Sequence, residues 1–189
     1  MSNQFLTNYT EVTFLDKIKD NLRRCKSFAF SVSFIKKAGL VLLFKDIEAA
    51  VERGAHGRII TSTYQNFTDI ESLKSFFALQ NKHGNFQCHL DYGCFHDNHY
   101  STLGYHSKGY LFEFDDGFEV IVGSSNITRY ALLKNIEWDV VVHETTPDVY
   151  SQAMIEFKDK WEATHLLNSD IIGLYSNKLN FAIERWDMD

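Results

Sequence analysis

The sequence predicts an α/β fold in which a mixed β-sheet is flanked by helices on both faces. Strand-like and helix-like runs alternate along most of the chain, one long hairpin interrupts that alternation, and no internal repeat or low-complexity linker divides it. The 189 residues are 44% hydrophobic with a single proline, a composition that supports a substantial core. We therefore expect residues 1–189 to form a single domain, which is either a free-standing protein or the N-terminal module of a longer one.

Helix starts in the first half of the chain are marked by a polar residue that is followed three positions later by an acidic one. Asn8 with Glu11 is expected to open the first helix, and Thr68 with Glu71 to open another that ends near residue 79. Hydrophobic patterning predicts strands at 27–34, 57–62 and 86–90, and a helix at 36–53 that Gly54 ends.

The second half continues the alternation after the hairpin. A short helix at 127–133 is followed by a strand at 136–143. Pro147 is expected in the first turn of a helix that reaches about residue 165, because proline is favoured there. Strands separated by helices, together with one inserted hairpin, indicate a sheet with both parallel and antiparallel pairs.

The hairpin is predicted from two alternating runs, residues 105–114 and 118–124, that flank a turn sequence. The turn reads Asp115-Asp116-Gly117, and a three-residue loop that ends in glycine is typical of a type I turn closed by a left-handed glycine bulge. Such a loop pairs Phe114 with Phe118 and sets the register of the whole hairpin.

This register would gather four polar side chains on one face. Counting outward from the turn, Lys108 faces Ser124 and His106 faces Asn126, and directly opposite residues share a face. A two-residue loop would shift the pairing by one and separate Ser124 and Asn126 from the other two. In the predicted register, an imidazole, an ammonium, a hydroxyl and a carboxamide can hold and attack a phosphate.

The same residues resemble a known signature. His106-x-Lys108 followed by Gly123-Ser124-x-Asn126 is similar to the HxK…GSxN motif of the phospholipase D superfamily. The acidic residue five positions after the lysine is Glu113 here, where the superfamily pattern has Asp. Glu113 falls on the strand face away from His106, so we interpret it as a supporting hydrogen-bond or ion-pair partner.

The resemblance implies metal-independent phosphodiester hydrolysis through a phosphohistidine, with no cofactor and no metal. His106 would be the nucleophile, while Lys108, Ser124 and Asn126 would hold the phosphate oxygens. Two copies of the motif meet in this superfamily, so one copy per chain implies a homodimer.

An acidic residue soon after the motif contacts the histidine in nucleases of the superfamily. Glu137 fits this role here, since a carboxylate on one ring nitrogen orients a nucleophilic imidazole. Asp139, two residues on and therefore on the same strand face, is the alternative. Arg129, just beyond the GSSN sequence, is a further candidate for binding a phosphate.

Charge, cysteine content and apolar run length bear on the binding partner and on the cellular location. The formal net charge of −6 gives no global basic surface, so any attraction for a nucleic acid must be local. The three cysteines do not make a disulfide framework and no signal-like start precedes them, so we expect a cytoplasmic protein. The longest apolar run, residues 38–44, is too short to cross a membrane.

A group of metal-ligating residue types precedes the hairpin. Its spacings, Cys-x5-Cys and His-x2-His, match none of the usual structural zinc sites, so a polar loop is the preferred interpretation and His96 or His99 would border the substrate. The group consists of Cys88, His89, Cys94, His96, Asp97 and His99.

The first half carries a second resemblance that bears on the substrate. Ser33-Phe34-Ile35, Arg58-Ile59-Ile60-Thr61 and residues 64–69 are similar to the phospholipase-D-like module of bacterial helicase-type and restriction-type proteins. This second resemblance favours a nucleic acid as the substrate, with DNA preferred over RNA. It also leaves open a fused or associated helicase domain. The competing hypotheses are a non-catalytic nucleic-acid-binding or dimerisation module, and a phosphodiesterase or phosphatidyl transferase that acts on lipid or nucleotide.

Overall fold

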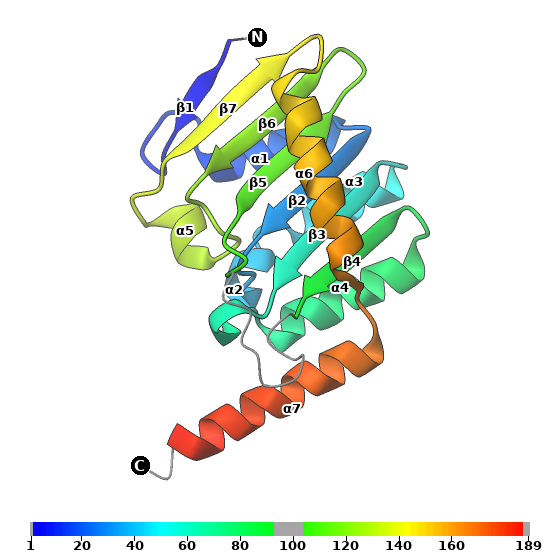
Figure 1. The fold of residues 1–189 in the computed structure, drawn as a ribbon. Helices are drawn as coiled ribbons and strands as arrows, with labels where there is room; N and C mark the ends of the chain where they lie inside the picture. The colour runs from blue at the N-terminus through cyan, green and yellow to red at the C-terminus, as the bar shows by residue number, and fades with distance from the viewer. Residues whose placement is uncertain (1, 93–103, 187–189) are drawn as a thin grey trace.

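The computed structural model describes residues 2–92 and 104–186, and these form one mixed sheet with helices on both faces (Figure 1). Within the described residues the sheet has eight strands in the order β1-β7-β6-β5-β2-β3-β4-β8. The β2-β3 and β3-β4 pairs are parallel and all others are antiparallel. The strands are β1 (Gln4–Leu6), β2 (Ser27–Val32), β3 (His56–Ser62), β4 (Phe86–Asp91), β5 (Lys108–Glu113), β6 (Phe118–Gly123), β7 (Asp139–Glu144) and β8 (His165–Leu166).

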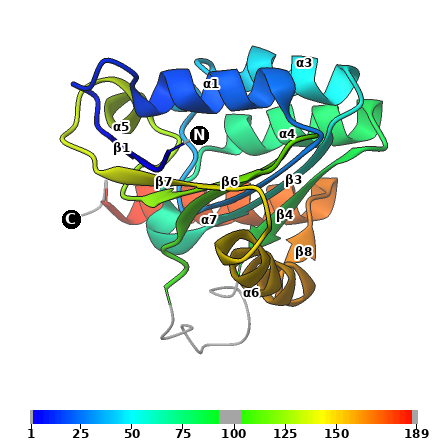
Figure 2. The same ribbon diagram turned by 90° about the horizontal axis from the view of Figure 1, so that it is seen from above.

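The two faces of the sheet are covered unequally (Figure 2). One face packs against α1 (Phe14–Arg24), α3 (Phe44–Glu52) and α4 (Ile70–Lys82), and encloses the main hydrophobic core. The other face packs against α6 (Val149–Ala163), where Phe157 meets a small cluster on β2, β3 and β5. The predicted fold class is confirmed. The remaining helices are α2 (Lys37–Leu40), the 3-10 turn η1 (Tyr64–Asn66), α5 (Arg129–Leu133) and α7 (Ser169–Trp186).

The first helix begins later than predicted. Thr13, not Asn8, is the N-cap: its hydroxyl accepts from the Asp16 N–H at 3.2 Å, and the Asp16 carboxylate accepts from the Thr13 N–H at 3.2 Å. Asn8 instead donates to the carbonyls of Ala131 and Asn135, at 2.8 and 2.9 Å. The expected Asn8–Glu11 start is therefore wrong, because tertiary contacts with α5 engage the Asn8 side chain.

The helix expected at 36–53 is two helices. A Cβ atom on Gly39 would lie 2.5 Å from the Thr128 Cα, so the backbone of α2 packs directly against that of residues 127–128. The chain turns after Leu40 and begins α3 at Phe44. Gly54 ends this region as predicted, with a φ of +103° that favours glycine.

Two other helix starts are displaced by one or two residues. α4 begins after Asp69, and the buried Thr68 hydroxyl accepts from the Ile35 N–H at 3.4 Å instead of capping the helix. α6 begins at Val149 and not at Pro147. The Glu144 carboxylate accepts from the N–H groups of Asp148, Val149 and Tyr150, which places a negative charge at the start of α6.

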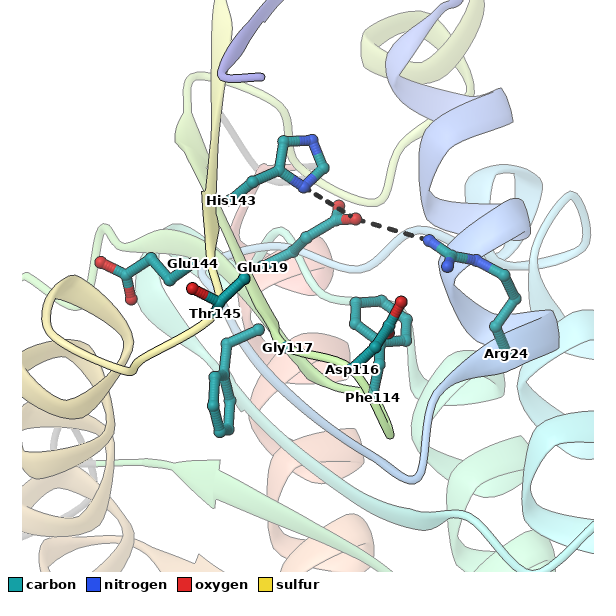
Figure 3. A pocket seen from close by; sticks show the side chains of 9 residues that line it. Arg24, Phe114, Asp116, Gly117, Glu119, His143, Glu144 and Thr145 are labelled. Carbon is teal, nitrogen blue, oxygen red and sulfur yellow. Dashed lines mark hydrogen bonds and ion pairs between the residues drawn. The ribbon is translucent and has the colours of Figure 1, made fainter. Parts of the chain in front are cut away.

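A buried ionic cluster joins α1 to the turn end of the sheet (Figure 3). The Glu119 carboxylate, 2% exposed, lies 2.9 Å from the Lys17 Nζ and 2.9 Å from the Asn21 Nδ2. Arg24 and His143 also contact it, at 3.5 and 3.2 Å. A cavity of about 310 Å³ opens beside this cluster and the hairpin turn, at the opposite end of β5 from Lys108.

Glu119→Ala is expected to destabilise the fold by about 3–5 kcal/mol, because it leaves the buried Lys17 ammonium without a counter-charge. Denaturant unfolding of both chains would measure the difference. Glu156→Ala is the matched control, since its partner Lys160 is exposed and the pair at 3.3 Å is solvated. Equal stability of the wild type and Glu119→Ala would contradict a structural role for the cluster.

Candidate active site

The predicted hairpin forms, but its register is not the expected one. β5 pairs with β6 through Glu113 opposite Phe118 and Gly109 opposite Val122. The Phe114 N–H donates to the Gly117 carbonyl at 2.8 Å, so Gly117 belongs to the pairing and not to a three-residue loop. The expected pairs of Lys108 with Ser124 and of His106 with Asn126 are therefore wrong.

The contact between Gly117 and β7 accounts for the difference. A Cβ atom at Gly117 would lie 2.5 Å from the Glu144 carbonyl oxygen, and the φ of +157° is accessible mainly to glycine. The glycine thus allows the close approach of the neighbouring strand instead of forming a bulge. This requirement comes from β7, which lies outside the hairpin.

Asn126 still reaches the end of the sheet where Lys108 lies, by a different route. β6 ends at Gly123, after which the chain leaves the regular strand and Ile127 pairs in parallel with Ile35. The Asn126 Oδ1 then accepts from the Phe34 N–H at 3.2 Å. The carboxamide therefore lies beside the carboxyl end of β2, because of an irregular segment and not because of strand alternation.

Lys108 lies between His106 and Ser33 in the candidate active site and contacts both side chains. It opens β5 opposite Val32, is 9% exposed, and its Nζ donates to the His106 carbonyl at 2.8 Å and to the Ser33 hydroxyl at 3.4 Å. The same Nζ lies 3.1 Å from the His106 Nδ1. Burial lowers the pKa of the Lys108 ammonium, and the negative charge of Glu137 opposes that shift.

The contact between Lys108 and His106 determines where the imidazole proton lies. An ammonium only donates, so the His106 Nδ1 accepts from it and the ring proton is on Nε2 in this arrangement. Donation of a proton to a leaving oxygen requires the imidazolium, in which both ring nitrogens of this exposed side chain carry a proton and Nδ1 no longer accepts from Lys108. Attack by Nε2 requires the other tautomer, which a carboxylate acceptor at Nδ1 would favour.

Ser124 and Glu137 lie together, apart from the hydrogen bonds of Lys108. The Ser124 hydroxyl donates to the Glu137 carboxylate, and the Trp138 N–H donates to the Ser124 Oγ at 3.1 Å. Within one chain, the described residues show no hydrogen bond between Glu137 and His106. Glu137 therefore acts on the Lys108 ammonium through its charge, while its expected contact with His106 stays a prediction.

Asp139 has a structural position. It is fully buried, and its carboxylate accepts from the Ser125 hydroxyl at 2.6 Å and from the Ser125 N–H at 3.3 Å. Tyr110 donates to the Ser125 carbonyl at 2.7 Å from the other side. These bonds hold the irregular segment that carries Asn126.

The other predicted residues have the following positions. Arg129 is the exposed first residue of α5, and Thr128 caps that helix by accepting from the Ala131 N–H at 3.2 Å. Glu113 accepts from the Ser27 hydroxyl at 2.9 Å, in agreement with its expected supporting role away from the site.

Sequence reasoning missed two groups at the end of β2. The Ser33 hydroxyl accepts from Lys108 and donates to the Ser107 carbonyl at 3.1 Å, and the Phe34 N–H binds Asn126. Ser31 hydrogen-bonds the Tyr105 hydroxyl at 2.6 Å. Position was the signal that could have identified them, because Ser33 and Phe34 are the last residues of the strand predicted at 27–34 and directly follow β2 at the sheet end that holds Lys108.

A pocket of about 450 Å³ adjoins His106 on the α6 face of the sheet. Its wall is mainly apolar and includes Leu111, Val120, Val122 and Phe157. Lys108 and Lys160 also line it.

The metal-ligating types noted in the sequence do not form a site in the part of the chain described. Cys94, His96, Asp97 and His99 lie outside the described residues. Burial raises the pKa of the Cys88 thiol, and burial lowers the pKa of His89, which stacks on Trp161, to about 4. Residues 2–92 and 104–186 contain no cluster of three or more such groups.

The side chains of His106, Lys108 and Asn126 lie at one end of the mixed sheet of an α/β fold, and a family match identifies the chain as an enzyme of the phosphodiesterase class. The chain belongs to the phospholipase D superfamily, since residues 18–161 match the family model described as "Cardiolipin synthase, PLD-like domain". A comparison with curated proteins finds no match. Among the described residues, no helix has the length and apolar character needed to cross a bilayer.

Solved structures share this fold at low sequence identity. Nuc from Salmonella typhimurium, a phospholipase D family member, has a TM-score of 0.65 and 20% identity over 89% of this chain and 99% of its own. NucT from Helicobacter pylori has a TM-score of 0.64 and 16% identity over 87% and 98%. Phosphatidylserine synthase from Haemophilus influenzae has a TM-score of 0.61 and 14% identity over 98% of this chain and 46% of its own.

Proposed function

We propose that this chain is a metal-independent phosphodiesterase, a DNA-cleaving nuclease of restriction or defence type, that acts through a phosphohistidine in a homodimeric active site. The observation that carries the proposal is the buried Lys108 ammonium, which contacts His106 directly at the end of the sheet where the Asn126 carboxamide also lies. These groups supply a nucleophile and fixed donors for phosphate oxygens. A cytoplasmic location, expected from the cysteine content, and a fused or associated helicase domain, implied by the sequence resemblance, belong to the same proposal.

The chemistry needs two histidines. The Nε2 of one His106, in the tautomer that carries its proton on Nδ1, attacks phosphorus and forms a P–N bond. The second His106, as the imidazolium, donates its Nε2 proton to the leaving oxygen as the P–O bond breaks. The second imidazole, now neutral, takes a proton from water, whose oxygen attacks phosphorus and displaces the first His106. Lys108 and Asn126 would bind the non-bridging oxygens, with Ser124 and Arg129 as further ligands.

An apolar stripe beside the site supports the homodimer. Phe5 pairs with Val140 and Val140 with Val122, so the three side chains lie in a row on one face of the sheet. Trp138 packs edge-on against Phe5, with 5.6 Å between ring centroids. All four side chains are substantially exposed, and Val122 also lines the pocket beside His106. A twofold contact over this stripe would bring the two His106 side chains toward one phosphate.

A lipid phosphodiesterase or phosphatidyl transferase is the second candidate. The apolar pocket beside His106 favours it, since acyl chains need such a wall, and the same fold occurs in a phosphatidylserine synthase. The net charge of −6 favours neither DNA nor an anionic lipid, so the choice between the two candidates depends on the sequence resemblance to nucleic-acid enzymes, which favours the nuclease.

Incubation with DNA, RNA, bis(p-nitrophenyl) phosphate and phosphatidylglycerol vesicles, each with EDTA, tests the proposal. We expect EDTA-resistant cleavage of labelled DNA and, after acid-free quenching, a chain that carries the labelled DNA fragment through the P–N bond to His106 and loses it at low pH. Cleavage that EDTA abolishes would overturn the phosphohistidine mechanism. Turnover of the lipid vesicles alone would support the lipid candidate. DNA binding without turnover would support a non-catalytic nucleic-acid-binding module.

A further inference from the structure

Three aromatic side chains form a cluster beside the candidate active site, here called the aromatic platform: Phe34, Tyr64 and Phe67. Phe34 follows β2, while Tyr64 and Phe67 come from the segment after β3. The Phe34 and Tyr64 rings are nearly parallel, at 4° with 6.2 Å between centroids. Phe67 packs edge-on against Phe34, with 5.0 Å between centroids.

The platform is continuous with the catalytic groups. The His106 ring lies edge-on to Phe34 and to Tyr64, with centroids 5.9 and 6.2 Å away. The Lys108 Nζ lies 5.8 Å from the Phe34 ring centroid, and the Phe34 N–H holds Asn126. A group bound to His106 and Lys108 would therefore sit next to aromatic surface.

The outer ring of the platform is exposed. Phe67 is 47% exposed, whereas Phe34 and Tyr64 are partly buried. The Lys36 Nζ, which pairs with Asp69, lies 5.9 Å from the Phe67 ring centroid. Phe67 thus offers an exposed apolar ring with the Lys36 ammonium over one face, and exposed aromatic rings combined with cations are what single-stranded nucleic acids bind.

The backbone between the two rings is held in an uncommon conformation. Gln65 and Asn66 have φ values of +53° and +57°, in the left-handed region that non-glycine residues rarely occupy. Gly104, two residues before His106, lies so close that a Cβ atom would be 2.6 Å from the Tyr64 ring. Uncommon backbone conformations of this kind concentrate at functional sites. Here the conformation lets both Tyr64 and Phe67 contact Phe34.

We propose that the aromatic platform stacks one unpaired base of the substrate strand next to the cleaved phosphate, which makes the enzyme selective for single-stranded or locally opened nucleic acid. This inference rests on the proposed nuclease function. The base of a nucleotide is one sugar away from its phosphate, so a phosphate held by His106 and Lys108 places a base over the neighbouring rings. A base within a duplex is already stacked on both faces and cannot use the platform.

Substitution of Phe67 can distinguish a role in base stacking from a role in holding the His106 ring in place. Phe34 and Tyr64 touch His106, so their removal would also disturb the imidazole, whereas the described ring contacts of Phe67 are with Phe34 and Lys36. Phe67→Ala is expected to lower kcat/KM about tenfold for a single-stranded oligonucleotide, and to leave bis(p-nitrophenyl) phosphate hydrolysis unchanged. Phe67→Trp is expected to restore oligonucleotide cleavage.

An abasic substrate makes the comparison specific to the base. One oligonucleotide carries a complete nucleotide beside the cleaved phosphate and its match lacks that base. We expect the wild type to prefer the complete strand about tenfold, and Phe67→Ala to cleave both at the same lower rate. Tyr9→Ala is the matched control, since Tyr9 is an exposed ring on the loop before α1.

Failure of the platform can be told apart from failure of the nuclease assignment. Equal losses for Phe67→Ala on the oligonucleotide and the small ester, or no loss on either, would overturn base stacking while the nuclease function stands. In a His106→Ala background, fluorescence anisotropy of a labelled oligonucleotide should show the same tenfold weakening on Phe67→Ala. A wild type that hydrolyses the small ester but neither binds nor cleaves the oligonucleotide would overturn both proposals.

Discussion

His106→Ala is expected to lower phosphodiester hydrolysis by about a thousandfold or more, while the chain stays folded. The variant removes both the proposed nucleophile and the proposed proton donor, because each copy of His106 serves one of these roles. The side chain is exposed and its removal opens no core cavity, so circular dichroism and the unfolding midpoint should match those of the wild type. Initial rates on DNA and on bis(p-nitrophenyl) phosphate measure the loss.

Mixed samples test whether the two histidines belong to one site. If each site takes His106 from both chains, an equal mixture of wild type and His106→Ala after exchange keeps about a quarter of the wild-type activity, since only dimers of two wild-type chains are complete. Independent monomers would keep about half. His56→Ala, at an exposed histidine that opens β3, is the control. Full activity in His106→Ala would rule out this residue as the nucleophile.

Val140→Lys is expected to separate the dimer and to lower activity at least about a hundredfold at low protein concentration. Val140 is 46% exposed at the middle of the apolar stripe, between Phe5 and Val122, so the new ammonium would be buried in the interface without a partner. A monomer would retain one His106 and lack the proton donor. Light scattering or sedimentation gives the mass, and rates at several concentrations give the activity.

The matched control for Val140→Lys adds the same charge elsewhere. Ile155→Lys changes a residue on α6 that is 62% exposed and does not belong to the stripe, so mass and rate should be unaffected. A Val140→Lys chain that remains dimeric would show that another surface forms the dimer. A fully active monomer would instead contradict the need for two motifs.

The contact between His106 and Lys108 could be predicted from the sequence because the two residues are close together in the chain. His106 and Lys108 are two positions apart near the start of a strand, where alternate residues share a face, and the structure brings them into contact at 3.1 Å. The alternation of strands and helices predicted the mixed sheet for the same reason, since hydrophobic period depends on neighbours in sequence. Thr13 could have been recognised as a cap from its own Asp16, but Asn8 offered an equivalent local pattern.

The route of Asn126 to the site could not be predicted from the hairpin alone. The turn sequence suited a three-residue loop, but Gly117 pairs with Phe114 and admits the Glu144 carbonyl of β7. Local turn preferences are weak compared with the packing of a third strand. Asn126 arrives through the irregular segment that Asp139 and Tyr110 hold.

The sequence by itself determined the fold class, the superfamily and the pairing of His106 with Lys108, since each depends on period or on spacing within a short segment. Only the tertiary structure decided the hairpin register, the placement of Asn126, the role of Ser33 and the assembly of the aromatic platform. These depend on contacts between residues far apart in sequence, such as Lys108 with Ser33 over 75 positions and Phe34 with Asn126 over 92. Such contacts form when whole elements pack on one another, and neither residue of a pair carries a local pattern that identifies its partner.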